Sequence, residues 1–437
     1  MVMKCLYVIL LLLSFCFSYA EAPNNLPPLC FSKVNDNITT TDGNLKITCI
    51  DRKHGYGTGS TYDNDIYSPK SVTFSPDGKK FYVNSLEGCK TVVYNTEGFN
   101  KIKAISHSFN SGKGEGWLKP SGYYQFSHYL DGDARPFKGK PVEMAFSKNG
   151  DYLFVPYYRR TFDINAQDPS ALAIIDSHTD EIVLMTETGP LPKMVSVSND
   201  GKLLAITHWG DNTVGFIDIS SDNYNCWKHL PPIIIGHKLN LNYSLTASIN
   251  RDTGSGYSLR GTVFLPGDSL LIVGGMGGPT AVIDLTTMKY IGNINGINQV
   301  RHIIVKDGII YFSRNVSGEI YSLPIENLLS AIRQAGNSRE FKVEGIRKTA
   351  VGGGARTLKS SPDGNYLFVA CNAASSIYVV NKRTMSLVGK FRVDSYPVGL
   401  DVSPDGRFVV VTSQGRSGQG GNAVNIFKID YLLDGVG

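Results

Sequence analysis

The feature that most constrains the fold is a short phrase that recurs along the chain. It consists of an apolar run, a Ser-x-Asp-Gly turn or a close relative of it, and a second apolar run. The clearest copies place the turn at residues 75–78, 361–364 and 403–406. Two apolar runs joined by a tight turn predict a β-hairpin. A hairpin that returns many times indicates a repeat architecture, in which each unit adds to one continuous structure.

Seven copies of the phrase can be aligned at the first residue of the turn. They fall at residues 75, 147, 198, 265, 306, 361 and 403, and the shortest interval between them is 41 residues. A second pair of strands follows most hairpins, as at 213–218 and 376–381. Four strands in a unit of about 40 residues are typical of a propeller blade. The sequence therefore predicts an all-β fold, a seven-bladed β-propeller of four-stranded antiparallel blades.

We expect residues 21–437 to form this single propeller domain. The last copy offers only a third strand, near 425–429, and the segment near 44–50 is expected to supply the fourth. Such pairing would close the ring with chain from both ends and leave no exposed sheet edge. The longer intervals are expected to hold insertions between blades, at 107–139, 221–259 and 324–348, the last with a short helix.

The first twenty residues predict a secretory signal peptide. Lys4 precedes an apolar stretch over 5–17, and a small-x-small cleavage site follows at 18–20. Lipid attachment at Cys16 is not expected, because Phe15 stands where such a site needs a small residue. No later segment is long and apolar enough to predict a membrane span. We therefore expect a secreted or periplasmic protein, monomeric and without a transmembrane segment.

Charge and cysteine content exclude some classes of function. The formal net charge of +5 is too small to indicate a nucleic-acid partner. The cysteines beyond the signal peptide are widely scattered and include no C-x-x-C pair, so they predict neither a zinc site nor a dense disulfide scaffold. Their pairing is left open; they are Cys30, Cys49, Cys89, Cys226 and Cys371.

The repeats resemble the YVTN-repeat β-propellers, a group related to lactonase-type and cytochrome-d1-type propellers. The Ser-Pro-Asp-Gly turns carry this resemblance, together with Phe-Tyr-Val-Asn-Ser at 81–85 and the strand ending Phe-Ile-Asp at 216–218. It covers roughly residues 68–430. The resemblance implies the propeller fold, but its members bind and catalyse different things, so it implies little about function.

In such a propeller the first strand of each blade starts beside the central channel. Counting five positions back from the turn gives one residue per blade at this point, and five of the seven are basic: Lys70, Val142, Lys193, Arg260, Arg301, Arg356 and Val398. The family usually has glycine at the next position, whereas this chain has functional side chains at Glu143 and His302. The ends of the second strands add Tyr157, His208, Trp209 and Arg314. Together these residues predict a basic, aromatic-rimmed channel mouth.

Crowded positive charges are costly unless an anion or nearby carboxylates compensate them, and arginine is well suited to hold carboxylate, sulfate or phosphate. The preferred interpretation is a binding protein without a cofactor, whose partner is an anionic small molecule, a glycan or an extracytoplasmic protein. The candidate ligand-binding residues are Lys70, Lys193, Arg260, Arg301, Arg356, Trp209, Arg314 and Tyr157. The alternative for these cations is local pairing with acids such as Glu143 and Asp211.

Two further functions stay open. One is an enzyme of the lactonase, lyase or hydrolase kind, with Glu143, His208 or His302 as the acid–base group. A metal at the hub would have only these two histidines and one glutamate, which is a thin ligand set. The other is an interaction platform on the outer surface. The chain contains no G-x-S-x-G, H-E-x-x-H or P-loop motif.

Overall fold

The computed structural model describes residues 33–109, 118–124, 137–160, 163–251, 254–416 and 420–432. The predicted signal peptide at 1–20, with Cys16, lies outside the described residues, as does Cys30. So does part of the predicted insertion at 107–139.

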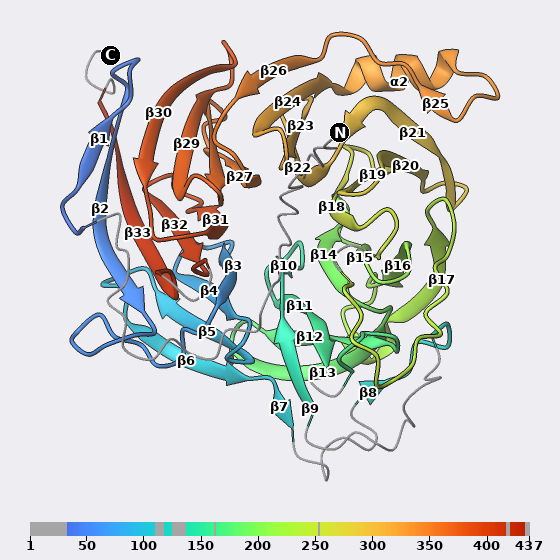
Figure 1. Cartoon of the computed structure of the whole chain (residues 1–437), viewed down its shortest axis with the longest axis horizontal. Helices are drawn as coiled ribbons and strands as arrows, with labels where there is room; N and C mark the ends of the chain where they lie inside the picture. The colour runs from blue at the N-terminus through green and yellow to red at the C-terminus, as the bar shows by residue number, and fades with distance from the viewer. Residues whose placement is uncertain are drawn as a thin grey trace, which may run out of the picture.

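Seven sheets are arranged around a central channel, as the sequence predicted (Figure 1). Their strands pair antiparallel except where the short added strands β8 (Leu118–Lys119) and β25 (Glu340–Phe341) each join a sheet in parallel. We number these sheets as blades 1 to 7 in chain order of their innermost strands. Blade 1 is β3 (Pro69–Phe74), β4 (Lys80–Ser85), β5 (Lys90–Asn95) and β6 (Lys101–Ser106). Blade 3 is β14 (Pro192–Val197), β15 (Leu203–His208), β16 (Thr213–Asp218) and β17 (Lys228–Ile234). Blade 6 is β27 (Ala355–Ser360), β28 (Tyr366–Cys371), β29 (Ser376–Asn381) and β30 (Ser386–Arg392).

Four blades carry extra strands or a helix, namely blades 2, 4, 5 and 7. Blade 2 is built on β10 (Ala145–Phe146), β11 (Tyr152–Arg160), β12 (Ser170–Asp176) and β13 (Glu181–Thr188), with β7 (Ser108–Phe109), β8 (Leu118–Lys119) and β9 (Phe137–Pro141) added. Blade 4 is β18 (Leu259–Phe264), β19 (Leu270–Gly275), β20 (Pro279–Asp284) and β21 (Lys289–Asn298), with β25 (Glu340–Phe341) added. Blade 5 is β22 (Val300–Lys306), β23 (Ile309–Arg314), β24 (Glu319–Pro324) and β26 (Arg347–Ala350). The helix α2 (Ile325–Gln334) joins β24 to β25 and packs Leu328 and Ala331 into the core of blades 4 and 5.

Blade 7 combines the two ends of the chain. Its inner strands are β31 (Pro397–Val402), β32 (Phe408–Ser413) and β33 (Ala423–Tyr431). The N-terminal strand β2 (Leu45–His54) pairs antiparallel with β33, from Leu45 opposite Tyr431 to His54 opposite Ala423. β1 (Asn37–Thr39) lies outside β2, so the blue N-terminal strands stand beside red β33 in Figure 1. The outer part of blade 7, formed by β1 and β2, therefore comes from the N-terminal part of the chain.

Two of the expected insertions contain strands that belong to the blades. The segment 221–259 includes β17, the outermost strand of blade 3, after the short 3-10 helix η2 (Tyr224–Cys226). The segment 107–139 holds β7 and β8 and most of β9, all of which join blade 2. These segments therefore complete or widen blades as well as connecting them.

In five of the seven blades, a serine at the start of the first-to-second-strand turn bonds to a side chain of the same turn. In blade 1 the Ser75 hydroxyl donates to Asp77 Oδ1 at 2.6 Å and accepts from the Lys80 amide at 3.0 Å. Ser198 and Ser403 make the same 2.6 Å bond to Asp200 and Asp405. The glycine of the turn needs a left-handed backbone, with φ of 70° at Gly78, which explains why the phrase ends in glycine.

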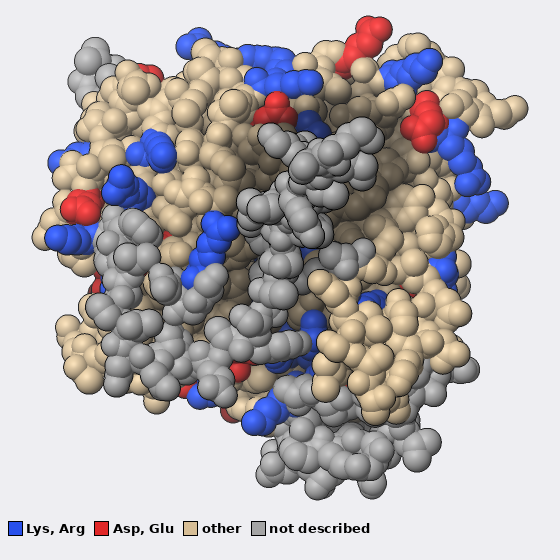
Figure 2. Space-filling view, viewed as in Figure 1, with Lys and Arg blue, Asp and Glu red and all other residues tan. Residues whose placement is uncertain are grey.

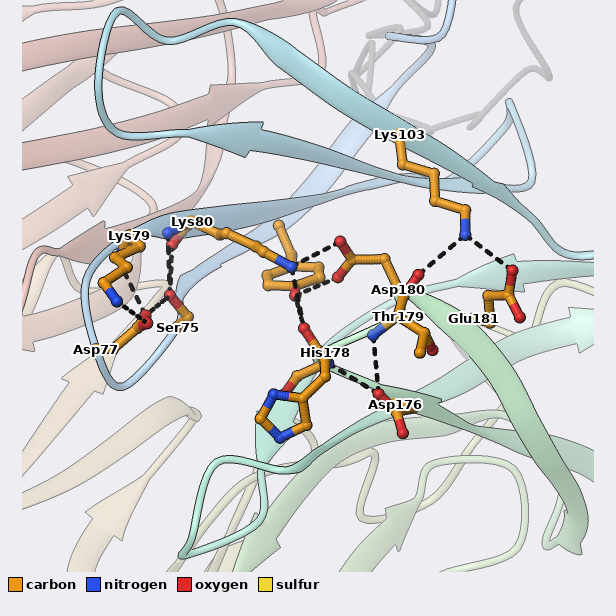
Figure 3. Close-up of polar contacts among 12 residues, drawn as sticks. Ser75, Asp77, Lys79, Lys80, Lys103, Asp176, His178, Thr179, Asp180 and Glu181 are labelled. Carbon is orange, nitrogen blue, oxygen red and sulfur yellow. Dashed lines mark hydrogen bonds and ion pairs between the residues drawn. The ribbon is translucent and has the colours of Figure 1, made fainter.

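We call this end of the propeller the turn end, and the opposite end, where first strands start and second strands finish, the mouth end. Polar contacts join neighbouring blades at the turn end (Figure 3). Lys80 of blade 1 lies 2.7 Å from Asp180 of blade 2, and Asp180 also accepts a 2.6 Å hydrogen bond from Tyr82. Lys103 and Glu181 make a second, exposed ion pair at 3.3 Å. These two pairs therefore match charges between blades 1 and 2 at this end.

Apolar side chains fill the space between blades. One cluster joins Phe81 and Val92 of blade 1 to Val410 and Ile426 of blade 7, all fully buried. Burial of one such side chain contributes about 1.5–3 kcal/mol. The described cysteines form no disulfide: Cys49, Cys89 and Cys371 are buried and Cys226 is exposed. Within the described ranges, no helix has the length and apolar character that crossing a membrane requires.

Candidate functional site: a basic cavity in the channel

The inner strands of blades 1 to 6 bring the predicted hub residues to one cavity. Its empty volume is about 330 Å³, part of it open to solvent. Ten residues line it: Lys70, Val142, Glu143, Lys193, Met194, Arg260, Arg301, His302, Arg356 and Thr357. Five are cations from five different blades, and one is a carboxylate. Lys and Arg side chains are visible around the central hollow of the face in Figure 2.

Three of these cations are deeply buried. Lys193 and Arg260 are each 7% exposed, and Arg356 is 5% exposed. Burial, followed by the charges of Arg356 and Arg301, holds the pKa of Lys70 well below its usual range. Burial likewise lowers the pKa of the Arg356 guanidinium. Burial is the largest cause of both shifts, and only at Lys70 do neighbouring cations add to it.

Glu143 is the single carboxylate of the cavity. The residue is half-buried: part of its surface is accessible, although protein atoms surround its carboxyl group. Burial raises the pKa of its carboxyl, although the charges of Lys70, Arg356 and Arg301 oppose this shift. The lining of the cavity therefore carries five cations and one carboxylate.

His302 is neutral in this setting. Burial, reinforced by Lys359 and Arg356, lowers its pKa to about 3. Its Nδ1 atom is buried and has no hydrogen-bond partner among the described residues. A neutral imidazole offers one donor and one acceptor nitrogen, so His302 has hydrogen-bonding capacity left for a ligand.

Trp209 lies beside the cavity and contacts two of the cations that line it. The Lys193 ammonium is 4.1 Å from the centre of the indole ring, and the Arg260 guanidinium carbon is 3.2 Å from it. The Trp209 side chain is only 5% exposed. Little of its ring is therefore left to stack on a sugar or another flat ligand.

Side chains from one blade hold the backbone of the hub position in the next. Thr207, at the end of β15, donates to the Arg260 carbonyl at 2.8 Å, and Thr412 of β32 donates to the Lys70 carbonyl at 2.7 Å. Ser313 of β23 makes the same bond to the Arg356 carbonyl. Asn84 of β4 donates to the Glu143 carbonyl at 3.1 Å. These interblade bonds fix the points from which the channel side chains project, and no local sequence pattern predicts them.

Three other candidate residues are placed outside the cavity lining. Tyr157 is fully buried, and its hydroxyl meets His107 Nδ1 at 2.8 Å. Arg314 contacts Glu319 at 3.1 Å and donates to Asn298 Oδ1 at 2.8 Å. These two side chains are therefore engaged within their own surroundings.

His208 is the third, and a closed hydrogen-bond network surrounds it. It is fully buried, and burial lowers its pKa to about 3. Its Nε2 accepts from the Gly189 amide at 3.1 Å and meets the Thr188 hydroxyl at 2.6 Å. Its Nδ1 meets the Thr213 hydroxyl at 2.8 Å. The structure thus separates His208 from Glu143 and His302, which share the cavity.

Within the part of the chain that the structure describes, no three His, Cys, Asp or Glu side chains converge as the ligands of a metal ion would. The channel cavity itself offers only Glu143 and His302 of these types.

Comparison with known proteins supports the fold and leaves the site open. No protein-family model matches the chain. A curated relative, Antigen Lp49 of Leptospira interrogans serogroup Icterohaemorrhagiae serovar copenhageni (strain Fiocruz L1-130), is 25% identical over 150 residues. That match covers 31% of this chain and 30% of the relative, so it spans less than a third of the relative's length.

Two solved structures share the architecture along most of the chain. Hydrazine synthase of Kuenenia stuttgartiensis superposes with a TM-score of 0.56 and 13% identity, covering 87% of this chain and 99% of that one. The β-propeller domain of Myceliophteria thermophila Cps50 (Swd1) gives 0.55 and 11%, covering 86% and 99%. Identities this low show the fold alone, a seven-bladed β-propeller.

Proposed function

We propose that this protein is a propeller that binds an anionic ligand in its basic channel. The observation that carries the proposal is the lining of one cavity by five cations from five blades against a single carboxylate. Holding like charges together in a low-dielectric site costs stability. An anion would offset that cost, and the gain appears as binding free energy.

The lining also indicates the chemistry of the ligand. Guanidinium groups bind carboxylate, sulfate or phosphate through two parallel hydrogen bonds, and three arginines line this cavity. Val142 and Met194 add an apolar portion to the lining. The ligand is therefore a small anion, or an anionic group that a glycan or an extracytoplasmic protein presents at the channel.

We further propose that the protein is secreted or periplasmic and that it is a divergent YVTN-repeat propeller. The signal-like segment at 1–20 and the repeated turn phrase support these two proposals. The name of the Leptospira relative, an antigen, agrees with exposure outside the cell. N-terminal sequencing of the exported protein would test the first, since a chain that begins near residue 21 is expected.

The binding proposal is tested by calorimetry and thermal unfolding with acetate, sulfate, phosphate and citrate at constant ionic strength. A ligand at one hundred times its Kd stabilises the folded state by about 2.7 kcal/mol. The variant Arg356→Gln should lose at least tenfold in affinity. The matched control Arg407→Gln, at an exposed turn-end arginine whose partner is Asp405, should keep wild-type affinity. Absence of binding by every anion, or equal losses in both variants, would contradict the proposal.

Glu143 supports a second candidate function. A carboxyl with a raised pKa and a neutral histidine, in a cavity lined by cations, could act in general acid–base catalysis of a lactonase, lyase or hydrolase reaction. A screen of lactones and uronate-type substrates decides between the two functions. Turnover by the wild-type protein that Glu143→Gln abolishes would establish the enzyme, whereas binding without turnover would leave the binding protein.

A further inference from the structure

A stack of alternating cations and aromatic rings leads from the rim into the channel. Lys193 Nζ lies 3.4 Å from the ring centre of Tyr158 and 4.1 Å from that of Trp209. Arg260 Cζ lies 3.2 Å from the Trp209 ring centre, and Arg159 Cζ lies 4.7 Å from that of Tyr158. The five residues come from blades 2, 3 and 4, so the stack links three neighbouring blades.

Trp209 is the member of the stack that contacts two cavity cations. Lys193 and Arg260 belong to adjacent blades, and both line the channel cavity. Two like charges near one another repel, and the electron-rich face of an indole attracts both. The Trp209 Nε1 atom is buried without a hydrogen-bond partner among the described residues. The indole is therefore placed by its ring contacts and by packing against Ala166 and Leu191.

We propose that Trp209 is a positioning residue, which holds Lys193 and Arg260 together as one subsite for an anion with two charged oxygens, such as a phosphate or sulfate group. This inference rests on the proposed anion binding in the channel. A monoanion needs one cation, whereas a dianionic group gains from two that are held close together. Trp209 itself touches the two cations and not the ligand.

The experiment compares the affinities of the wild type and three variants for inorganic phosphate and for acetate, measured by calorimetry at constant ionic strength. Trp209→Leu removes the aromatic face and should weaken phosphate binding about tenfold, with a smaller effect on acetate. Trp209→Phe keeps an aromatic face and should retain most of the phosphate affinity. The matched control is Trp227→Leu, a change at another buried tryptophan of blade 3, whose indole nitrogen donates to the Ser221 carbonyl at 2.7 Å. This control should bind both anions as the wild type does.

Fluorescence gives a second readout that a merely structural role would not move. Phosphate binding at Lys193 and Arg260 changes the charge beside the Trp209 ring, so tryptophan emission should shift during a phosphate titration. The shift should persist in Trp227→Phe and disappear in Trp209→Phe. If phosphate binds the wild-type protein without a shift of the Trp209 emission, it does not bind beside Lys193 and Arg260, which overturns the inference even if Trp209→Leu does not fold.

The outcomes separate the inference from the proposed function. If Trp209→Leu and the wild type bind phosphate equally, Trp209 does not position the subsite, while anion binding stands. If phosphate and acetate lose affinity by the same factor, the preference for a dianion is wrong. If no anion binds the wild-type protein, the proposed function fails and the inference fails with it.

Discussion

The two ends of this propeller are built from the same seven hairpins and differ in how they treat charge. At the turn end, Asp77, Asp200 and Asp405 accept hydrogen bonds from neighbouring hydroxyls and amides, and these bonds lower their carboxyl pKa values, although burial opposes them. At the mouth end, burial raises the pKa values of Glu143 and Asp211. Hydrogen bonds stabilise the charged form of these turn-end carboxyls, whereas burial disfavours the charged form of the two mouth-end carboxyls.

A single strand shows both behaviours. β16 begins just after Asp211 at the mouth end and ends at Asp218 at the turn end. Hydrogen bonds from Ser220 lower the pKa of Asp218, whereas burial raises the pKa of Asp211 to about 6. Strongly shifted pKa values gather at functional sites. Together with the five cations that line the cavity, this comparison supports the proposed ligand site at the mouth end.

The two ends should differ most in how the removal of a charge changes the free energy of unfolding. The change is expected to have opposite signs at the two ends. Asp180→Asn at the turn end breaks a mostly buried ion pair and should lower the free energy of unfolding by about 3–4 kcal/mol. The double variant Arg301→Gln/Arg356→Gln at the mouth end should leave the ligand-free protein as stable as the wild type or more stable. Chemical denaturation of both variants checks this prediction.

Glu181→Gln serves as the turn-end control, because its exposed pair with Lys103 is worth less than about 1 kcal/mol. A large loss of stability in the arginine double variant would show that the channel cations are structural and would remove the contrast between the ends.

The pH dependence of stability should separate Asp211 from the turn-end acids. Its folded-state pKa, about 6, lies above the ordinary value of 3.8, so the folded protein binds this proton more tightly. The stabilisation is complete below pH 3.8 and is lost as the pH rises through 6, by at most about 3 kcal/mol. Asp211→Asn should remove this fall, measured by urea unfolding between pH 4 and 7. Asp218→Asn should retain it, and a fall that persists in both variants would count against the assignment.

A turn glycine should affect stability alone. Gly308 has φ of 74° and open space where a Cβ would lie, so Gly308→Ala should cost only the left-handed backbone, about 1–2 kcal/mol. Gly353→Ala is the control, since that glycine lacks this backbone conformation and a Cβ would make an ordinary contact. Anion affinity should be unchanged in both variants. A loss of affinity in Gly308→Ala would mean that the two ends are coupled.

The smallest effect is expected at the interblade hydrogen bonds. Thr207→Val removes the donor to the Arg260 carbonyl and should cost about 1 kcal/mol, with a few-fold loss of anion affinity. Thr262→Val is the matched control, because the buried Thr262 hydroxyl has no partner among the described residues. That change should be neutral or stabilising. Equal effects of the two substitutions would contradict a role of Thr207 in fixing the channel.

The sequence predicted the propeller because its turns are local: the side chains that build the Ser75 turn lie within five residues of one another. Counting back from these turns also pointed to the residues that share the cavity, since a strand of fixed length carries each of them to the channel. His208 shows where this reasoning stops. Its partner Tyr124 comes from a distant segment and contacts it at 3.2 Å, which no local pattern reveals.

Long-range partners account for the other differences. The Trp209 stack depends on rings and cations that only the packing of blades 2, 3 and 4 brings together. The hydroxyls of Thr207 and Thr412 donate to backbone carbonyls of the next blade, so their role at the channel depends on how the blades pack. Sequence patterns describe single hairpins, and these features belong to the contacts between them.

The pairing of β2 with β33 has a consequence for the order of events in folding. The strand β2, at 45–54, has to wait for the strand at 423–431 before it gains its partner in blade 7. Contacts between such distant parts of a chain form slowly. Lys70 joins the other cations of the cavity only when blade 1 docks on blade 7. The repulsion between these like charges therefore arises in the step that closes the propeller. The seam in blade 7 is thus expected to be the last part of the molecule to assemble and the first to open.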